Sequence, residues 1–162
     1  MQVMHGWNER LAAGVAHEAR VAHALNDRGW EVASWGQGVL PPGIQEALSR
    51  SGSKWRHFPD LVAAREGDII TVDAKDRLRS TQSGRYAVSR DCVSFGLQFI
   101  AAFGMPVFYV FGNLNVLSPV EVQAYGSLGP RIRGGAYFLV PERLGHHFDD
   151  VFGVVSHHNE AA

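Results

Sequence analysis

The sequence feature that most constrains the fold is the segment 57–77, HFPDLVAAREGDIITVDAKDR. It contains two apolar runs, Leu61–Arg65 and 69–75, which are rich in Val and Ile and are separated by Glu66 and Gly67. Enrichment in Val and Ile on both sides of a glycine-containing turn is typical of a β-hairpin. The segment therefore predicts two antiparallel strands joined by a tight turn.

The register of this hairpin decides which side chains share a face. A loop of two or four residues centred between Glu66 and Gly67 places Asp60 opposite Asp73, whereas a three-residue loop would shift the register and separate them. Residues two apart on a strand lie on one side, so Asp60, Asp73 and Lys75 share a face. The opposite face pairs apolar residues: Ala63 with Ile70, Leu61 with Val72, and Pro59 with Ala74. Opposed carboxylates roughly 5 Å apart repel each other, so the pattern predicts a cation between them.

The residues Pro59-Asp60 and Asp73-Ala74-Lys75, separated by twelve residues, resemble the PD-(D/E)xK motif of the restriction-endonuclease-like nucleases. The resemblance extends upstream to Glu18 and downstream through 88–112, and within the superfamily it is most similar to archaeal-type Holliday junction resolvases and their phage relatives. It implies an α/β fold of the restriction-endonuclease type, with a central mixed β-sheet flanked by helices.

Length and composition set limits on this reading. A chain of 162 residues fits a single domain over 1–162, and 46% hydrophobic residues argue against disorder. The net charge is −1, so a nucleic-acid site must be a local basic patch. The single cysteine, Cys92, excludes an internal disulfide and a cysteine-based zinc cluster. With no apolar run of roughly 20 residues and no signal-peptide pattern, we expect a cytoplasmic protein without membrane contact.

The segment 8–28 predicts a helix that ends at Gly29. Its expected inward stripe is Leu11, Val15, Glu18, Ala22 and Leu25. Glu18 lies in the middle of that stripe, where an unpaired carboxylate is costly, so it is either paired with a core arginine or part of a site. The resemblance implies the second alternative, because related nucleases place a helical glutamate here as a further metal-site acid. His17 and His23 lie off the stripe and are expected to face solvent.

The remaining pattern predicts alternating strands and helices. Expected strands cover 30–35, 106–111, 115–117 and 136–140, and expected helices begin at Ser89 or Ser94 and at Ser118. A strand, a helix and a further strand in succession imply a parallel crossover. The segment 36–56 is predicted to be an insertion with a short helix over 43–50, and 157–162 a frayed tail.

Two arginine-bearing loops are candidate phosphate contacts. The segment 77–90 is predicted to be a flexible polar loop, and the segment 128–135 is a glycine-rich loop. Guanidinium groups in such loops suit phosphate oxygens, although a solvated surface loop is the alternative. The candidate nucleic-acid-binding residues are Arg77, Arg79, Arg85, Arg90, Arg131 and Arg133.

The predicted site has oxygen ligands only, which suits Mg²⁺ or Mn²⁺ rather than zinc. Asp60 and Asp73 are the expected ligands, with Glu18 acting directly or through water. The resemblance adds the backbone carbonyl of Ala74. Lys75 has three open roles: orienting a water, accepting its proton if the lysine pKa is depressed, or stabilising negative charge.

These residues predict a Mg²⁺-dependent deoxyribonuclease with Asp60, Asp73, Lys75 and Glu18 as its catalytic residues. By resemblance to resolvases, the expected substrate is branched DNA such as a four-way junction. Paired symmetric cuts would require a homodimer. Two alternatives stay open: a non-catalytic nucleic-acid-binding protein on the same fold, and a sequence-specific restriction-type endonuclease.

Overall fold

The computed structural model describes residues 2–75, 79–80, 83–129, 131 and 135–155, with side chains from residue 14 onward except those of 79–80. The helices are α1 (Gln2–Asn26), α2 (Pro42–Ser51), α3 (Arg90–Phe103), α4 (Pro119–Tyr125) and α5 (Phe148–Phe152), and the 3-10 turns are η1 (Gln37–Val39), η2 (Lys54–His57) and η3 (Glu142–Leu144). The strands are β1 (Glu31–Ser34), β2 (Leu61–Arg65), β3 (Asp68–Lys75), β4 (Arg79–Ser80), β5 (Arg85–Ser89), β6 (Val107–Phe111), β7 (Val116–Leu117), β8 (Ser127–Leu128) and β9 (Tyr137–Pro141).

The predicted hairpin is formed by β2 and β3 in the predicted register. Leu61 pairs with Val72, and the ladder continues to Arg65 opposite Asp68. The loop is therefore the two residues Glu66 and Gly67, whose φ angles are 53° and 94°. Positive φ at both positions gives a turn whose twist matches that of the flanking strands, and glycine adopts such an angle without steric cost.

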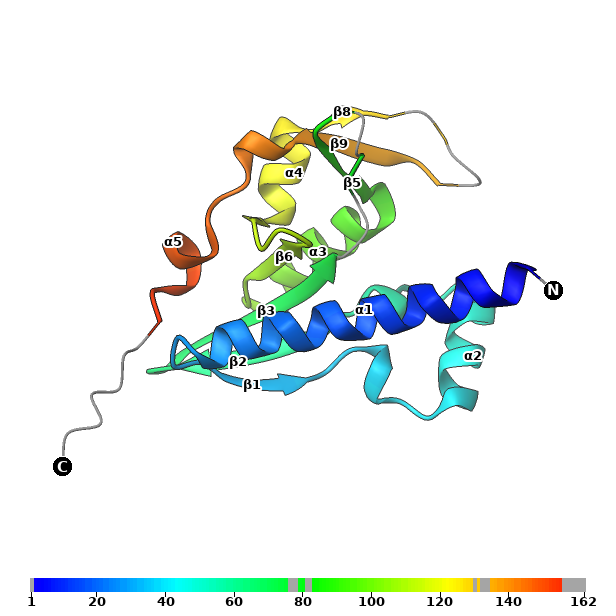
Figure 1. The fold of residues 1–162 in the computed structure, drawn as a ribbon, viewed down its shortest axis with the longest axis horizontal. Helices are drawn as coiled ribbons and strands as arrows, with labels where there is room; N and C mark the ends of the chain where they lie inside the picture. The colour runs from blue at the N-terminus through cyan, green and yellow to red at the C-terminus, as the bar shows by residue number, and fades with distance from the viewer. Residues whose placement is uncertain (1, 76–78, 81–82, 130, 132–134, 156–162) are drawn as a thin grey trace.

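The main sheet has five strands in the order β1-β2-β3-β6-β7. β3 and β6 are parallel and the other neighbours are antiparallel, so the sheet is mixed, as predicted. The parallel step needs a crossover, which α3 provides. In Figure 1, α1 lies across β2 and β3, and the tip of β3 points toward α3 and β5. This α/β arrangement with flanking helices confirms the predicted fold class.

A second sheet was not predicted. It has four strands in the order β4-β5-β9-β8, and β5 pairs with β9 from Arg85–Pro141 to Ser89–Tyr137. The predicted polar loop over 77–90 therefore contains strands on both sides of Gly84, whose φ is 59°. β9 supplies the long-range partner that makes this segment extended, and no local pattern reveals such a partner.

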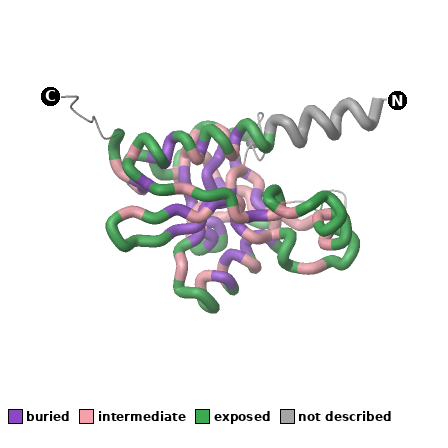
Figure 2. Tube along the Cα trace, turned by 90° about the horizontal axis from the view of Figure 1, so that it is seen from below, coloured by how far each residue is buried: buried purple, intermediate pink, exposed green. Residues whose placement is uncertain are grey.

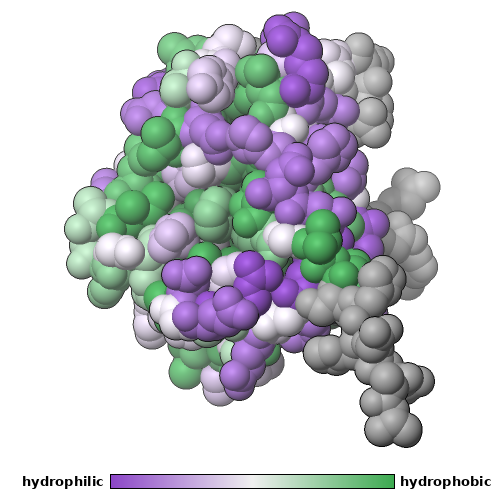
Figure 3. All heavy atoms as spheres, turned by 90° about the vertical axis from the view of Figure 1, so that its left-hand side faces the viewer, coloured by the Kyte–Doolittle hydropathy of each residue, from purple (hydrophilic) through white to green (hydrophobic). Residues whose placement is uncertain are grey.

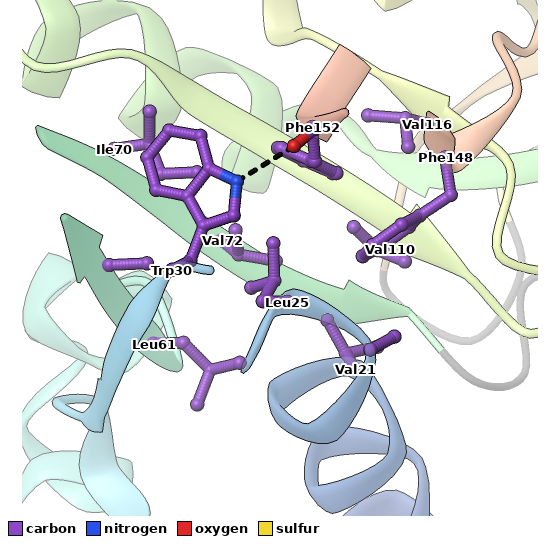
Figure 4. Packing of buried hydrophobic residues seen from close by; sticks show 12 residues of the cluster. Val21, Leu25, Trp30, Leu61, Ile70, Val72, Val110, Val116, Phe148 and Phe152 are labelled. Atoms are coloured by element: carbon purple, nitrogen blue, oxygen red, sulfur yellow. Dashed lines mark hydrogen bonds between the residues drawn. The ribbon is translucent and has the colours of Figure 1, made fainter. Parts of the chain in front are cut away.

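The main core lies between the sheet, α1 and α5. Val21 and Leu25 of α1 are fully buried, and Figure 4 shows them beside Leu61 and Val72 of the hairpin. The Trp30 indole N–H donates to the carbonyl oxygen of Phe152 at 2.8 Å, which attaches α5 to the end of α1. Burying each large aliphatic side chain contributes about 1.5–3 kcal/mol, so these contacts hold α1 on the sheet.

The inward face of α1 differs from the predicted stripe. Val15 is 61% exposed, whereas His17 is 4% exposed. The His17 side chain is within hydrogen-bond distance of the Val110 carbonyl oxygen, 3.0 Å from Nε2, and Arg20 lies beside Nδ1. The prediction that His17 faces solvent was wrong, because a histidine with partners for both ring nitrogens is accommodated in a core. His23 is solvent-exposed, as predicted.

A second core packs α3 and α4 against β6 and the second sheet. The helix α3 buries the side chains of Cys92, Val93 and Phe99. Its first turn is capped by the Ser89 hydroxyl, which accepts the Cys92 N–H. Figure 2 shows the buried residues gathered in the centre of the molecule and the exposed residues on its outer turns. The predicted start at Ser118 is confirmed by a capping box between Ser118 and Glu121.

Among the described residues, no helix combines the length and the apolar character needed to cross a bilayer. Figure 3 shows the face that carries the β2–β3 turn, where hydrophilic and hydrophobic side chains are mixed.

Candidate active site

The site is formed where the hairpin opens, beyond the last pair of the β2–β3 ladder. Asp60 precedes β2, and its carbonyl oxygen accepts backbone N–H groups of Trp35 and Gly36 at 2.7 and 3.1 Å. Its Oδ2 accepts the Ala74 N–H at 2.8 Å. A Cβ on Gly36 would lie 3.0 Å from the Cα of Asp60, so glycine permits this close approach. These contacts hold the Asp60 side chain against β3.

Asp73 and Lys75 form an ion pair on the same face of β3, with Lys75 Nζ 2.7 Å from Asp73 Oδ2. Their side chains are only 11% and 16% exposed. The Cys92 thiol donates to the same Oδ2 at 3.4 Å. Asp73 therefore receives donors from its own strand and from the first turn of α3, which fixes its orientation.

Lys75 is held as a cation. Burial opposes its charge, but the Asp73 carboxylate and its hydrogen bond outweigh burial and raise the pKa of Lys75 above its ordinary value. Its ammonium also lies 5.4 Å from the centre of the Tyr109 ring, a favourable cation–π position. Of the three roles left open, this environment favours charge stabilisation and water orientation over proton acceptance, which requires a depressed lysine pKa.

The charge of Asp73 disfavours the ionised form of Asp60. Burial and then the Asp73 charge raise the pKa of Asp60 from 3.8 to about 8, against the opposing effects of Lys75 and the Ala74 N–H. The Glu18 charge acts in the same direction. A cation bound beside Asp60 would favour its ionised form, which burial and the Asp73 charge disfavour.

Glu18 lies on α1 toward the same site. It is half-buried, and burial raises its pKa, while a hydrogen bond to the Ser34 side chain lowers it and the Asp73 charge raises it. Glu18 also lines a cavity with Ser34 and Leu61, at the junction of α1 and β1 with β2. The carboxylate is thus within electrostatic range of Asp73, and no core arginine contacts it among the described residues.

The donor set fits a divalent cation with few protein ligands. No group of three His, Cys, Asp or Glu side chains in the described part of the chain is close enough to hold a metal ion. Asp60 and Asp73 are the carboxylates predicted to hold a cation, and Glu18 is within electrostatic range of both. Magnesium keeps several waters and needs only one or two carboxylates, so this arrangement suits it. The roles of Glu18 and of the Ala74 carbonyl as ligands stay predictions.

The predicted arginines divide into separate groups. Arg90 and Arg131 line one cavity of about 530 Å³ beside the start of α3. Arg85 is exposed at the start of β5. Arg77 and Arg133 lie outside the described residues, and Arg79 lies on β4 without a described side chain. The structure therefore brings Arg90 and Arg131 together and leaves Arg85 on the second sheet.

Two residues of the site, Cys92 and Tyr109, were not predicted. Tyr109 of β6 is the direct neighbour of Asp73 in the parallel register, and its hydroxyl donates to the Cys92 carbonyl oxygen at 3.1 Å. The predicted parallel crossover implied that β6 lies beside β3, but the register that selects Tyr109 comes only from packing. Cys92 follows the Ser89 cap by three residues, which is the signal that could have placed it at the start of α3.

The mixed sheet, its flanking helices and the β2–β3 hairpin define an α/β fold of the restriction-endonuclease type. The structure is similar to that of Hjc, a Holliday junction resolvase from the archaeal hyperthermophile Archaeoglobus fulgidus. The TM-score is 0.56 at 16% identity, and the match covers 86% of this chain and 95% of that one. Because identity is this low, the likeness shows the fold alone, and it confirms the predicted fold family.

Two further solved structures are similar at a lower level. One is a bacterial homing endonuclease, with TM-score 0.43 and 16% identity over 80% of this chain and 73% of the other. The other is a nuclease from a fusselovirus, with TM-score 0.46 and 11% identity over 93% of this chain and 90% of the other. Both scores are too low to carry an argument. No protein-family model and no curated protein sequence matches this chain.

Proposed function

We propose that this protein is a Mg²⁺- or Mn²⁺-dependent nuclease that hydrolyses phosphodiester bonds of DNA. The observation that carries the proposal is the convergence of Asp60, Asp73 and Lys75 at the open end of the hairpin. There, the pKa of Asp60 is raised to about 8, and Asp73 is paired with Lys75 at 2.7 Å. A surface hairpin with merely solvated charges would not bury them in this way.

Each residue has a defined part in this chemistry. Asp60 and Asp73 would hold the cation, and Glu18 would hold one of its waters. The bound cation supplies Lewis-acid stabilisation of phosphoryl charge and lowers the pKa of water. Lys75, as a buried ammonium, would orient the attacking water and stabilise negative charge on a phosphoryl oxygen. The buried side chains of Cys92 and Tyr109, which lie next to Asp73, would keep its carboxylate in one orientation.

The proposed substrate is branched DNA, with a four-way junction as the leading candidate. The fold likeness to a junction resolvase supports it, as does the absence of a helix built to read base edges among the described elements. Arg90 and Arg131, in the cavity beside the start of α3, would contact backbone phosphates, which gives little sequence information. Symmetric cutting of a junction would require a homodimer with two active sites.

The test is cleavage of equal amounts of junction, flap, linear duplex and single-stranded DNA with Mg²⁺ and with EDTA, alongside the mass in solution. We expect cleavage that EDTA abolishes, strongest on the junction, by a dimer. Equal cleavage of all four substrates by a monomer would indicate a generic nuclease. Cutting of one defined duplex sequence would indicate a restriction-type enzyme, and binding without cleavage would indicate a non-catalytic DNA-binding protein.

A further inference from the structure

The η2 turn, Lys54–His57, presents cations next to the proposed active site. Lys54 and Arg56 are exposed, and the turn is capped by the Ser53 hydroxyl, which accepts the Trp55 N–H. Trp55 packs edge-on against Phe58, 6.1 Å between ring centroids, and Phe58 packs against Phe99 of α3 at 5.4 Å. This aromatic attachment gives the two cations a defined position on the protein body.

A groove of about 240 Å³ runs between this turn and α3. Lys54, Arg56 and His57 line one side, and Asp91, Ser94 and Phe95 line the other. Asp91 and Ser94 also line the cavity that contains Arg90 and Arg131. The groove and the cavity are therefore adjacent on the exposed side of α3, where both are lined by Asp91 and Ser94. Lys54 and Arg56 line the groove, and Arg90 and Arg131 line the cavity.

One end of the groove, at His57, lies near the proposed active site. His57 is three residues before Asp60, and its ring lies 6.2 Å from that of Phe95 across the groove. The charges of Lys75 and Asp73 both act on His57, although burial is the largest cause of its lowered pKa. The end of the groove lined by His57 is thus within electrostatic range of the proposed metal site.

The cations of the turn are available to a ligand. Lys54 donates to the amide oxygen of Gln98 at 3.2 Å, and among the described residues neither Lys54 nor Arg56 pairs with a carboxylate. By contrast, Arg50 on the preceding helix pairs with Glu46. Among the described residues that line the groove, Asp91 is the one acidic side chain, and it would repel a phosphate.

We propose that this groove, from Lys54 and Arg56 across α3 to Arg90 and Arg131, binds the nucleic-acid backbone and leads it into the Asp60–Asp73 site. The inference rests on the proposed nuclease function and extends its binding surface to the η2 turn. A polyanion of regular phosphate spacing fits a groove with cations at both ends and a cation-dependent site at its edge. Asp91 limits the affinity and keeps binding reversible.

The test measures junction and duplex binding in EDTA by fluorescence anisotropy over a range of salt concentrations, so that cleavage plays no part. The double variant Lys54→Ala/Arg56→Ala should bind at least ten-fold more weakly at low salt, with a salt slope reduced by about 2. The matched control is Arg50→Ala/Arg143→Ala, which removes two exposed arginines outside the groove. Asp91→Asn should tighten binding several-fold. Circular dichroism and melting temperature verify that each variant is folded.

The groove proposal is contradicted if the two double variants weaken DNA binding equally, or if neither weakens it. It is also contradicted if the wild-type protein does not bind DNA. These outcomes are separable from failure of the nuclease proposal, which is read from cleavage by the wild-type protein with Mg²⁺. If the wild-type protein cleaves DNA and the Lys54→Ala/Arg56→Ala variant binds DNA as tightly as wild type, only the groove proposal is contradicted. If the wild-type protein binds DNA through the groove but does not cleave it, only the nuclease proposal is contradicted.

Discussion

The backbone N–H of Ala74 donates to the Asp60 carboxylate at 2.8 Å, across the open end of the hairpin. This contact joins the two halves of the predicted motif, which are separated by twelve residues in the sequence. It also places Asp60 close enough to Asp73 for the second charge to disfavour the first. The ionised form of Asp60 is therefore disfavoured in the folded protein, and this has testable consequences.

The pH dependence of stability should report Asp60. Its pKa is raised to about 8 in the folded protein, above its ordinary value of 3.8. Between these values the folded state binds more protons than the unfolded state, so the free energy of unfolding should fall as pH rises, by up to about 1.4 kcal/mol per pH unit. Denaturant titrations from pH 5 to 8 without metal measure the slope. Asp60→Asn should remove most of it, whereas Asp68→Asn, at an exposed position on β3, should not.

The Asp73–Lys75 pair should show strong energetic coupling. Both side chains are nearly buried, so removing one partner leaves the other charge unpaired. Asp73→Ala and Lys75→Met should each abolish cleavage and each destabilise the protein by about 3 kcal/mol, while the double variant should lose much less than the sum. A double-mutant cycle by urea denaturation measures this. Additive losses would mean that the pair does not interact in solution.

Glu18→Gln should separate a functional from a structural role. Burial already disfavours the ionised form of Glu18, so the neutral amide should leave the melting temperature unchanged or slightly higher. Loss of the charge should raise the Mg²⁺ concentration for half-maximal cleavage by about 10- to 100-fold. Glu31→Gln, at an exposed position on β1, is the control. A lower melting temperature with normal cleavage would assign Glu18 to the core instead.

Cys92 should be unreactive in the folded protein. Burial and the adjacent Asp73 charge raise the pKa of its thiol to about 11. Because the thiolate is the reactive form, alkylation at pH 7.5 should be at least about 100-fold slower in the native protein than in denatured protein. Mass spectrometry of iodoacetamide-treated samples measures both rates. Rapid labelling of the native protein would show that the packing around Cys92 exposes the thiol to solvent by frequent local opening.

The hairpin was predictable because its determinants are local. Glu66 and Gly67 mark the turn, and the alternation of apolar and charged residues assigns Asp73 and Lys75 to one face. The sequence is compatible with loops of two, three or four residues, and the structure shows the two-residue loop. The capping box at Ser118 is local in the same way. Turn position and helix caps depend on neighbours within a few residues, which a single sequence contains.

The inward face of α1 and the second sheet were not predictable, for a different reason. Val15 and His17 differ in burial because of where the helix lies on the sheet, and the Val110 carbonyl provides the histidine with a partner distant in sequence. The strand nature of β5 depends likewise on β9. The energy of such contacts depends on chain segments that only the fold brings together.

The sequence by itself determined the hairpin and the shared face of Asp73 and Lys75, whereas the two-residue loop that places Asp60 opposite Asp73 came from the structure. Only the tertiary structure decided the surroundings of these residues: Cys92 and Tyr109 behind Asp73, Glu18 within range of its charge, and the η2 cations beside α3. The reason is that alternation along a strand is set by backbone geometry, whereas burial, pKa and the convergence of separate elements are set by packing.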